Sequence, residues 1–173
     1  IDAGCEILGY ASDITRTFPV NGKFSNPQKE IYEIVLNAQI QAIASIIPGG
    51  DVNKPHEIAC EIISRGLMKL GIMDDISNLR KFYMHGTGHW LGLDVHDVGA
   101  KEIDNSFRKF EVGMVTTVEP GIYIRKDDKI DPKYWNIGIR IEDDVLVTMD
   151  GNHVLSEAAI KNVDDIEYLM SQS

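Results

Sequence analysis

The chain has 173 residues, a hydrophobic fraction of 43%, a charged fraction of 25% and a formal net charge of -10. This composition is typical of a folded globular protein and excludes a disordered one, while the negative charge argues against nucleic acid or an anionic membrane surface as the main partner. Because no apolar run approaches the roughly 18 residues that span a bilayer, a membrane is not an expected partner either.

The length suits one domain, so we expect residues 1–173 to form a single domain. Cys5 and Cys60 form no CxxC pair, which argues against a disulfide framework or a thiolate zinc site and favours a cytoplasmic location with both thiols buried. The chain starts at Ile1, within a predicted strand, which suggests that an upstream part of a longer protein has been removed.

The first 20 residues predict two strands, 1–8 and 10–20, around a turn at 6–9. This register places Asp2 directly opposite Asp13. Two facing carboxylates repel each other unless one is protonated or a cation lies between them. The alternative is a pair of aspartates that face solvent.

Two helices follow the hairpin. Asn26 as N-cap and Pro27 in the first turn begin a helix that ends before Pro48, and its apolar residues recur with a period of 3.6. A second helix is predicted from about Asn53 to Gly71, followed by a polar connection with a short helical turn. We expect both helices to be scaffold, and His56 to lie at the surface.

Residues 84–97 hold three of the five histidines, His85, His89 and His96. Three glycines in the same stretch disfavour a helix, by about 1 kcal/mol each relative to alanine, so a loop or an extended backbone is expected. The alternative to a functional cluster is a glycine-rich loop with incidental histidines.

The C-terminal half predicts two strands that carry acids, preceded by a polar loop at 101–111. Residues 113–119 alternate so that Glu119 shares a face with Val115 and Thr117, and Pro120 fixes the end of the strand. Residues 138–148 predict one continuous strand with Arg140 and Glu142 on the same face. A short helix is expected at 164–170.

Together these elements offer four carboxylates and one imidazole: Asp2, Asp13, His89, Glu119 and Glu142. Oxygen-rich ligands with one nitrogen favour manganese over zinc, and four carboxylates balance two divalent ions. Two metal ions can share a water, lower its pKa and hold it as a bridging hydroxide beside a polarised carbonyl, which is the chemistry of amide hydrolysis.

Several motifs resemble, in order, those of the catalytic domain of bacterial Xaa-Pro aminopeptidases (aminopeptidase P), which has the pita-bread fold shared by prolidase and methionine aminopeptidase. They are IDAGCE, YASDITRTFPVNGKF, HGTGHWLGLDVHDVG, GMVTTVEPGIYI and the segment 138–148. The resemblance implies an α+β fold, a curved and mostly antiparallel sheet with flanking helices, truncated at its N-terminus. It covers nearly the whole chain.

The resemblance also implies a role for each candidate ligand. Asp2 resembles a ligand of one metal ion, Asp13 and Glu142 resemble the carboxylates that bridge both ions, and His89 and Glu119 resemble ligands of the other. Glu119 further resembles the general acid and base that carries a proton to the leaving proline nitrogen.

Four other residues resemble groups that contact the substrate or orient the ligands. His96 corresponds to a histidine that hydrogen-bonds the substrate, His85 to one that lines the prolyl pocket, and Arg140 to an arginine beside the metal ligands, with Tyr123 a weaker candidate of that kind. The alternative for both histidines is a structural role within the core.

The implied activity is release of the N-terminal residue from peptide substrates with proline at the second position. One alternative is a prolidase that cleaves Xaa-Pro dipeptides, and another is a silent peptide-binding module, which would not need four converging acids. Because the family contributes upstream strands and another histidine, we expect residues 1–173 alone to assemble much of the metal site with weak or no activity. An unpaired sheet edge favours a homo-oligomer.

Overall fold

The computed structural model of the chain describes residues 1–172. Its helices and strands are β1 (Asp2–Ala3), β2 (Glu6–Ile7), β3 (Tyr10–Ala11), β4 (Ile14–Thr15), α1 (Asn26–Ala44), α2 (Lys54–Lys69), the 3-10 helix η1 (Ile76–Lys81), β5 (Glu102–Ile103), β6 (Ser106–Phe107), β7 (Val115–Val118), β8 (Gly121–Ile124), the 3-10 helix η2 (Pro132–Tyr134), β9 (Ile137–Arg140), β10 (Asp143–Thr148), β11 (Gly151–Val154) and α3 (Val163–Met170).

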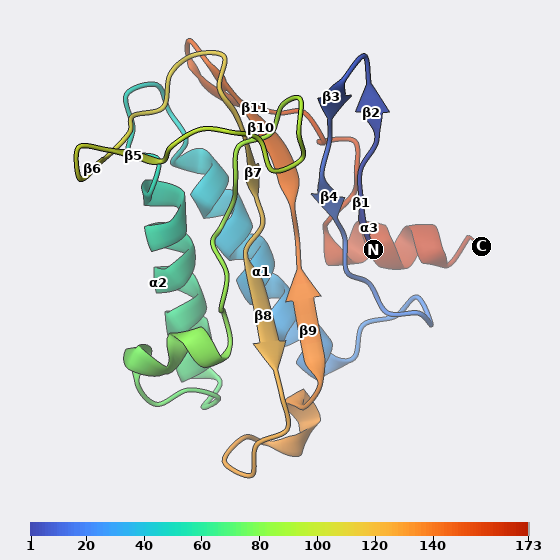
Figure 1. The fold of residues 1–173 in the computed structure, drawn as a ribbon. Coiled ribbons are helices and arrows are strands. Elements are labelled where there is room, and N and C mark those ends of the chain that lie inside the picture. The colour runs from blue at the N-terminus through green and yellow to red at the C-terminus, as the bar shows by residue number, and fades with distance from the viewer. Residues whose placement is uncertain (173) are drawn as a thin grey trace.

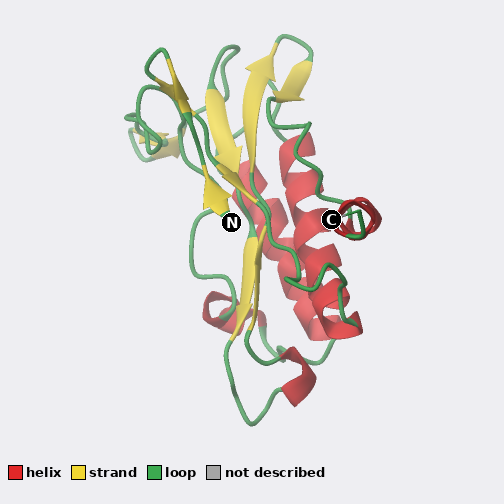
Figure 2. Ribbon diagram, turned by 90° about the vertical axis from the view of Figure 1, so that its right-hand side faces the viewer, coloured by secondary structure: helices red, strands yellow, loops and turns green. Residues whose placement is uncertain are grey.

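The strands form one layer and the two long helices form another (Figures 1 and 2). All strand pairs are antiparallel: β7, β10 and β11 form a three-stranded sheet, and β8 pairs with β9. Helices α1 and α2 pack against each other behind these strands, and α1 contacts β7, β8 and β9. This is the predicted α+β class. Within residues 1–172, no helix combines the length and the apolar character that crossing a membrane requires.

Two hydrophobic cores hold the helices against the strands. The larger one joins α1 and α2 to β8 and β9 through fully buried side chains such as Tyr32, Ile63, Ile122 and Ile139. The smaller one lies behind β7 and β10 and includes Trp90, Phe110, Val118 and Val145. The front face of the strands therefore remains free to carry polar side chains.

Helix α1 begins one residue earlier than predicted. Its N-cap is Ser25, whose hydroxyl accepts the amide of Gln28 while the Gln28 side chain accepts the amide of Ser25, a complete capping box. Asn26 is therefore the first helical residue, followed by Pro27. Serine and asparagine are both good caps, so only the reciprocal bond with Gln28 distinguishes them.

The N-terminal hairpin has a different register from the predicted one. Asp2 pairs with Thr15, and Asp13 is therefore not directly opposite Asp2. The four-residue turn lies one residue later than predicted, at 7–10 instead of 6–9, with Leu8 and Gly9 both at positive φ as its central residues. A shift of two residues keeps every side chain on its face, so Asp2 and Asp13 remain diagonal neighbours on one side.

The strand predicted over 138–148 is two strands. β9 ends at Arg140 and pairs with β8, whereas β10 begins at Asp143 and pairs with β7 and β11. The break at Ile141 and Glu142 lies beside the break between β7 and β8 at Glu119, because Asp143 pairs with Val118. The two strands keep their common direction (Figure 1), so the alternation of faces survives the break.

Two smaller predictions are also wrong. The polar loop predicted at 101–111 contains the β5–β6 hairpin, whose turn residues Asp104 and Asn105 have positive φ. Cys5 is exposed rather than buried and Cys60 is half-buried; both are free thiols. The short helical turn predicted after α2 is confirmed by η1.

Candidate metal centre

The stretch 87–91 adds an irregular fourth strand to the edge of β7. The amide of Thr117 donates to the carbonyl of His89, and the amide of Glu119 donates to that of Thr87, at 2.9 and 2.7 Å. Gly88 permits this pairing, because a Cβ at this position would lie only 1.9 Å from the carbonyl oxygen of Thr117. The glycine thus brings His89 and Glu119 onto neighbouring strands.

His89 presents one ring nitrogen to the acids. Its Nδ1 lies 3.0 Å from the carbonyl oxygen of Trp90, to which only a protonated nitrogen can donate, so in the neutral ring Nε2 keeps its lone pair. Nε2 lies 3.4 Å from Asp13 Oδ2 and 3.8 Å from Glu119 Oε1. The backbone therefore fixes the tautomer that a metal ligand requires.

The five candidate ligands converge from four separate segments of the chain. Within each of three groups, the potential ligand atoms lie within 4.8 Å of one another: Asp2 with Asp13 and Glu142, His89 with Glu119 and Glu142, and Asp13 with His89 and His96. Asp13, His89 and Glu142 each belong to two groups. The side chains predicted to act together are therefore close in space.

The charges in this cluster are poorly balanced without a cation. Burial raises the pKa of Glu119 to about 7, with the neighbouring acids Asp13 and Asp2 adding to the shift. Burial likewise raises the pKa of Glu142 to about 7, and burial and Asp2 raise the pKa of Asp13. Buried carboxylates that raise one another's pKa are stabilised by divalent ions, so the donor set fits a metal centre.

Arg140 and Thr15 hold two of the acids in place. The Thr15 hydroxyl lies 2.7 Å from Glu142 Oε2 and 3.2 Å from Asp2 Oδ1, and it accepts a hydrogen bond from Arg140 Nε at 3.0 Å. The Arg140 guanidinium also forms an ion pair with Asp2. Arg140 lies beside Glu142 on the predicted face.

His85 and His96 both border the cluster. His85 Nε2 lies 2.8 Å from the hydroxyl of Tyr123, and its Nδ1 lies 3.8 Å from Glu119 Oε2. Burial lowers the pKa of His85, which favours the neutral ring. The His96 ring packs on that of His89 with 4.1 Å between centroids. All nine predicted residues, Tyr123 included, thus lie in or beside one site.

Sequence reasoning missed several residues that support this site. Thr15 lies two residues after Asp13, on the same strand face, and that spacing could have identified it. Asp144, two residues after Glu142, accepts the Asp13 amide at 3.2 Å, and burial raises its pKa to about 6. Its other oxygen is buried and has no hydrogen-bond partner among residues 1–172.

His56 is not the surface residue that was predicted. Its half-buried ring lies 2.8 Å from the hydroxyl of Thr87, which in turn contacts the hydroxyl of Tyr83 at 2.5 Å. This chain of hydrogen bonds fixes the loop that supplies His89. No signal in the sequence separates such a histidine from an exposed one in the first turn of a helix.

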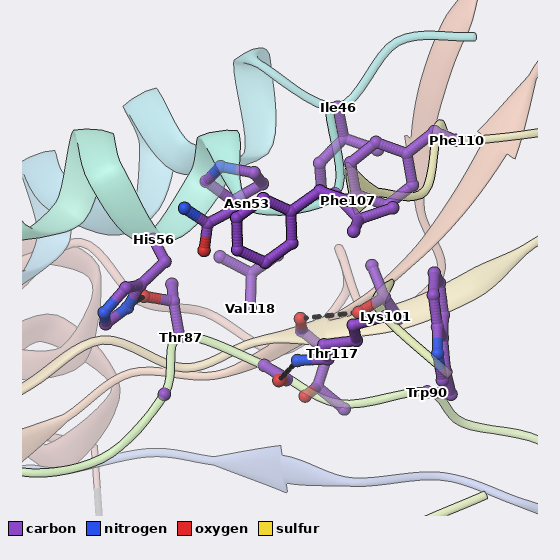
Figure 3. A pocket seen from close by; sticks show the side chains of 15 residues that line it. Ile46, Asn53, His56, Thr87, Trp90, Lys101, Phe107, Phe110, Thr117 and Val118 are labelled. Atoms are coloured by element: carbon purple, nitrogen blue, oxygen red, sulfur yellow. Dashed lines mark hydrogen bonds between the residues drawn. The ribbon is translucent and has the colours of Figure 1, made fainter. Parts of the chain in front are cut away.

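A separate cavity of about 140 Å³ lies behind the 86–88 segment (Figure 3). His56, Thr87 and Lys101 form its polar side, where Lys101 hydrogen-bonds the carbonyl of Gly88, and aromatic residues such as Phe107 and Phe110 form the rest. None of the five candidate ligands lines it. The cavity is therefore not the metal centre.

Comparison with known proteins agrees with this geometry. The model of metallopeptidase family M24 matches residues 1–149. The Xaa-Pro aminopeptidase of Haemophilus influenzae is 53% identical over 99% of this chain, which covers 41% of that protein. The Xaa-Pro aminopeptidase of Escherichia coli is 50% identical over 98% of this chain and 40% of its own length.

Solved structures give the same result. Aminopeptidase PepP of Pseudomonas aeruginosa superposes with a TM-score of 0.95 at 50% identity, over 99% of this chain and 40% of that one. Escherichia coli aminopeptidase P with the inhibitor Pro-Leu superposes with a TM-score of 0.92 at 49% identity, again over 99% of this chain and 40% of that one. The predicted pita-bread fold is confirmed, and the chain spans about 40% of the length of these relatives. The chain belongs to metallopeptidase family M24.

Proposed function

We propose that the full-length protein is a metal-dependent aminopeptidase that releases the N-terminal residue from peptides with proline at the second position. The observation that carries the proposal is the convergence of four acids and one imidazole into ligand groups in which the atoms lie within 4.8 Å of one another. The names of relatives about 50% identical support the substrate class. We further propose that residues 1–173 belong to a single catalytic domain, of which they form a part, and that the protein is cytoplasmic and homo-oligomeric.

Two divalent ions fit the cluster. Asp2, Asp13 and Glu142 would hold one, and His89, Glu119 and Glu142 the other. We propose that Asp13, like Glu142, would be shared by both ions. Oxygen donors in this excess favour manganese. When bound, such a pair would supply Lewis acidity that lowers the pKa of a shared water, the source of the proposed hydroxide nucleophile.

Glu119 is placed to move the proton in this reaction. Burial raises the pKa of its carboxyl to about 7 in the metal-free protein. Bound ions would lower this pKa and keep Glu119 a carboxylate, the form that can accept a proton. It borders His85, the residue proposed to line the prolyl pocket, at 3.8 Å. The proton that Glu119 accepts from the water would pass to the proline nitrogen as the peptide bond breaks.

His85, His96 and Arg140 orient the substrate and the ligands. Tyr123 and the backbone of Gly86 hold the His85 ring through hydrogen bonds of 2.8 and 2.7 Å, so the ring can form a fixed wall for proline. His96 lies over His89, where a ring N–H can donate to the substrate carbonyl oxygen. Arg140 holds Asp2 from the rim of the site.

The first test is Glu142→Gln in the full-length protein. Turnover should be abolished and manganese affinity reduced, because one of the two shared carboxylates loses its charge. Kinetic assays on a tripeptide with proline second and metal titration by calorimetry check this. Unchanged turnover would exclude the bridging role of Glu142.

Substrate length and metal content distinguish the proposed aminopeptidase from a prolidase and from a silent peptide-binding module. The proposed enzyme cleaves a tripeptide with proline at the second position, whereas a prolidase cleaves only Xaa-Pro dipeptides. A silent module would retain no manganese after incubation and dialysis. The same assays on residues 1–173 alone should show metal binding with weak or no cleavage.

A further inference from the structure

Four basic side chains gather at the far end of β8, although the chain as a whole carries a net charge of -10. Arg80, Lys81, Arg125 and Lys126 line a cavity of about 450 Å³ together with Met84 and other residues, of which only Asp127 is acidic. η1 supplies the first two residues, and the chain just after β8 supplies the other two. We call this group the basic cavity.

The positive charge of the basic cavity is not neutralised within residues 1–172. None of its four basic residues forms an ion pair there. Lys126 lies over the Trp135 ring at 5.1 Å from its centroid. The Asp127 carboxylate accepts the Lys129 amide at 2.9 Å. A concave surface with unpaired cations favours an anionic ligand.

The basic cavity continues the proposed substrate site along one face of β8. Ile122 and Ile124 are buried behind the strand. Because side chains alternate along a strand, Tyr123 and Arg125 lie on the opposite, front face, which also carries Glu119. Tyr123 contacts His85 at 2.8 Å, and its amide donates to the carbonyl of Phe82. The β8 face and the 82–85 segment thus connect the proposed prolyl pocket at His85 to the basic residues.

The distance suits a peptide substrate. Glu119 and Arg125 are six residues apart, which corresponds to roughly 20 Å at about 3.3 Å per residue of extended chain. An extended peptide advances by about the same amount per residue. A peptide whose first bond is at Glu119, and whose proline lies against His85, would therefore reach the basic cavity about six residues downstream.

We propose that the basic cavity is a distal subsite that binds acidic residues of the substrate about six positions after the cleaved bond. This inference rests on the proposed function, since it takes the direction of the peptide from the prolyl pocket at His85. The recognised chemistry is a carboxylate, from either an aspartate or glutamate side chain or a free C-terminus. Peptides with acids at this position should have a lower KM, while kcat should change little.

The test compares matched peptides on the full-length protein. Each begins Ala-Pro and carries Asp-Asp, Asn-Asn or Lys-Lys at about positions six and seven, with an amidated C-terminus. The Asp-Asp peptide should have a KM roughly three- to tenfold below that of Asn-Asn, and the difference should shrink in 0.5 M salt. A further Asn-Asn peptide with a free C-terminus tests the other source of the carboxylate.

Variants localise the effect. Lys81→Ala combined with Arg125→Ala should raise the KM of the Asp-Asp peptide to that of the Asn-Asn peptide and leave the latter unchanged. Lys23→Ala combined with Lys69→Ala is the matched control, since it removes two exposed charges elsewhere and should have no effect. Equal KM values for all three amidated peptides, or an equal effect of the control, would overturn the proposal.

A binding assay separates this inference from the proposed function. Anisotropy of the labelled Asp-Asp peptide, measured on the Glu142→Gln variant, reports binding without cleavage. If the wild-type protein cleaves no Xaa-Pro peptide, the proposed function fails, whatever the basic cavity binds. If Lys81→Ala with Arg125→Ala leaves peptide binding unchanged, or if a single-stranded oligonucleotide binds this surface more tightly than the peptide, the distal subsite is wrong.

Discussion

Thr15 shows how a neutral side chain can organise charged ones. Its single hydroxyl contacts Glu142 and Asp2 and accepts a hydrogen bond from Arg140, so it connects an acid from each half of the chain with the arginine beside them. Groups that orient metal ligands in this way commonly affect metal affinity as strongly as some ligands do.

Replacing Thr15 with valine should therefore weaken manganese binding about 10- to 100-fold, because the shape is kept and the hydroxyl is lost. Calorimetric titration of the metal measures the change. Thr15→Ser keeps the hydroxyl and should restore most of the affinity. If serine and valine have the same effect, the methyl packing of Thr15 matters rather than its hydrogen bonds.

Glu119 and Glu142 should make the stability of the metal-free protein depend on pH. Burial raises the pKa of each carboxyl to about 7. A carboxyl with a raised pKa in the folded state opposes folding above its unfolded pKa of about 4.3, and this opposition fades as it becomes protonated. We expect the free energy of unfolding, measured with urea and a chelator, to rise as the pH falls from about 8 to about 5.

Saturating manganese should remove the pH dependence of the unfolding free energy near neutral pH. The bound ions would stabilise the charged form of both carboxylates, so neither would take up a proton in this range. The metal-free variant with Glu119→Gln and Glu142→Gln should also show a flatter profile. A slope in that variant equal to the slope of the wild type would assign the dependence to other groups.

At the scale of elements, the pairing of the 87–91 segment with β7 depends on Gly88. Gly88→Ala would put a methyl group 1.9 Å from the Thr117 carbonyl oxygen, so the two strands must separate. We expect a loss of about 1–3 kcal/mol of stability, measured by denaturant unfolding, and weaker metal binding as His89 moves.

Gly86 provides the matched control in the same segment. A methyl group there would meet its nearest atom only at 3.9 Å, and no positive φ requires a glycine. Gly86→Ala should therefore be close to neutral for stability. If both alanine variants were equally destabilised, general loop flexibility and not the close approach at Gly88 would be the cause.

The sequence predicts the presence and type of an element where one of its faces is buried, because the apolar residues then recur with a fixed period. It does not predict where the element ends or which strand it pairs with. The 3.6-residue period in α1 identified the helix because Ile31, Val35 and Ala38 all face the core. The cap at Ser25 depends on a bond that no period encodes. Likewise, alternation along 138–148 is the same in one strand or two, so the break at Glu142 was not visible in the sequence.

The residues of the candidate site could be predicted from the sequence, but their positions relative to one another could not. Residue types and family motifs selected Asp2, Asp13, His89, Glu119 and Glu142, which lie together in the structure. The register that separates Asp2 from Asp13 follows from the positive φ of Leu8, a conformation rarely adopted outside glycine and asparagine. A sequence pattern does not report such a turn.

At the scale of the whole molecule, Asp143 connects segments from both ends of the chain. This fully buried carboxylate contacts Arg16, Lys161, Gln39 and Ser156 at 2.6 to 2.7 Å. Burial alone would raise the pKa of Asp143, but the hydrogen bonds from Lys161, Arg16 and Ser156 hold it below its ordinary value. Arg16 also donates to the carbonyls of Thr15 and Glu142.

Asp143→Ala should cost about 3–5 kcal/mol of stability, because Arg16 and Lys161 would lose the partner for their largely buried charges. Urea unfolding at neutral pH measures the loss. Glu61→Ala removes an acid from the exposed pair with Arg65 and should change stability by less than about 1 kcal/mol. A loss below about 1 kcal/mol for Asp143→Ala would contradict the connecting role.

The paired breaks at Glu119 and Glu142 have a mechanical consequence. They divide the sheet into an upper part with β7, β10 and β11 and a lower part with β8 and β9, and both acids lie on the crease between them. Rotation of one part against the other would bend the backbone at both acids and change how their carboxylates face His89 and Asp2. Cations held between them would lock the crease, so rigidity of the sheet and occupancy of the centre should rise and fall together.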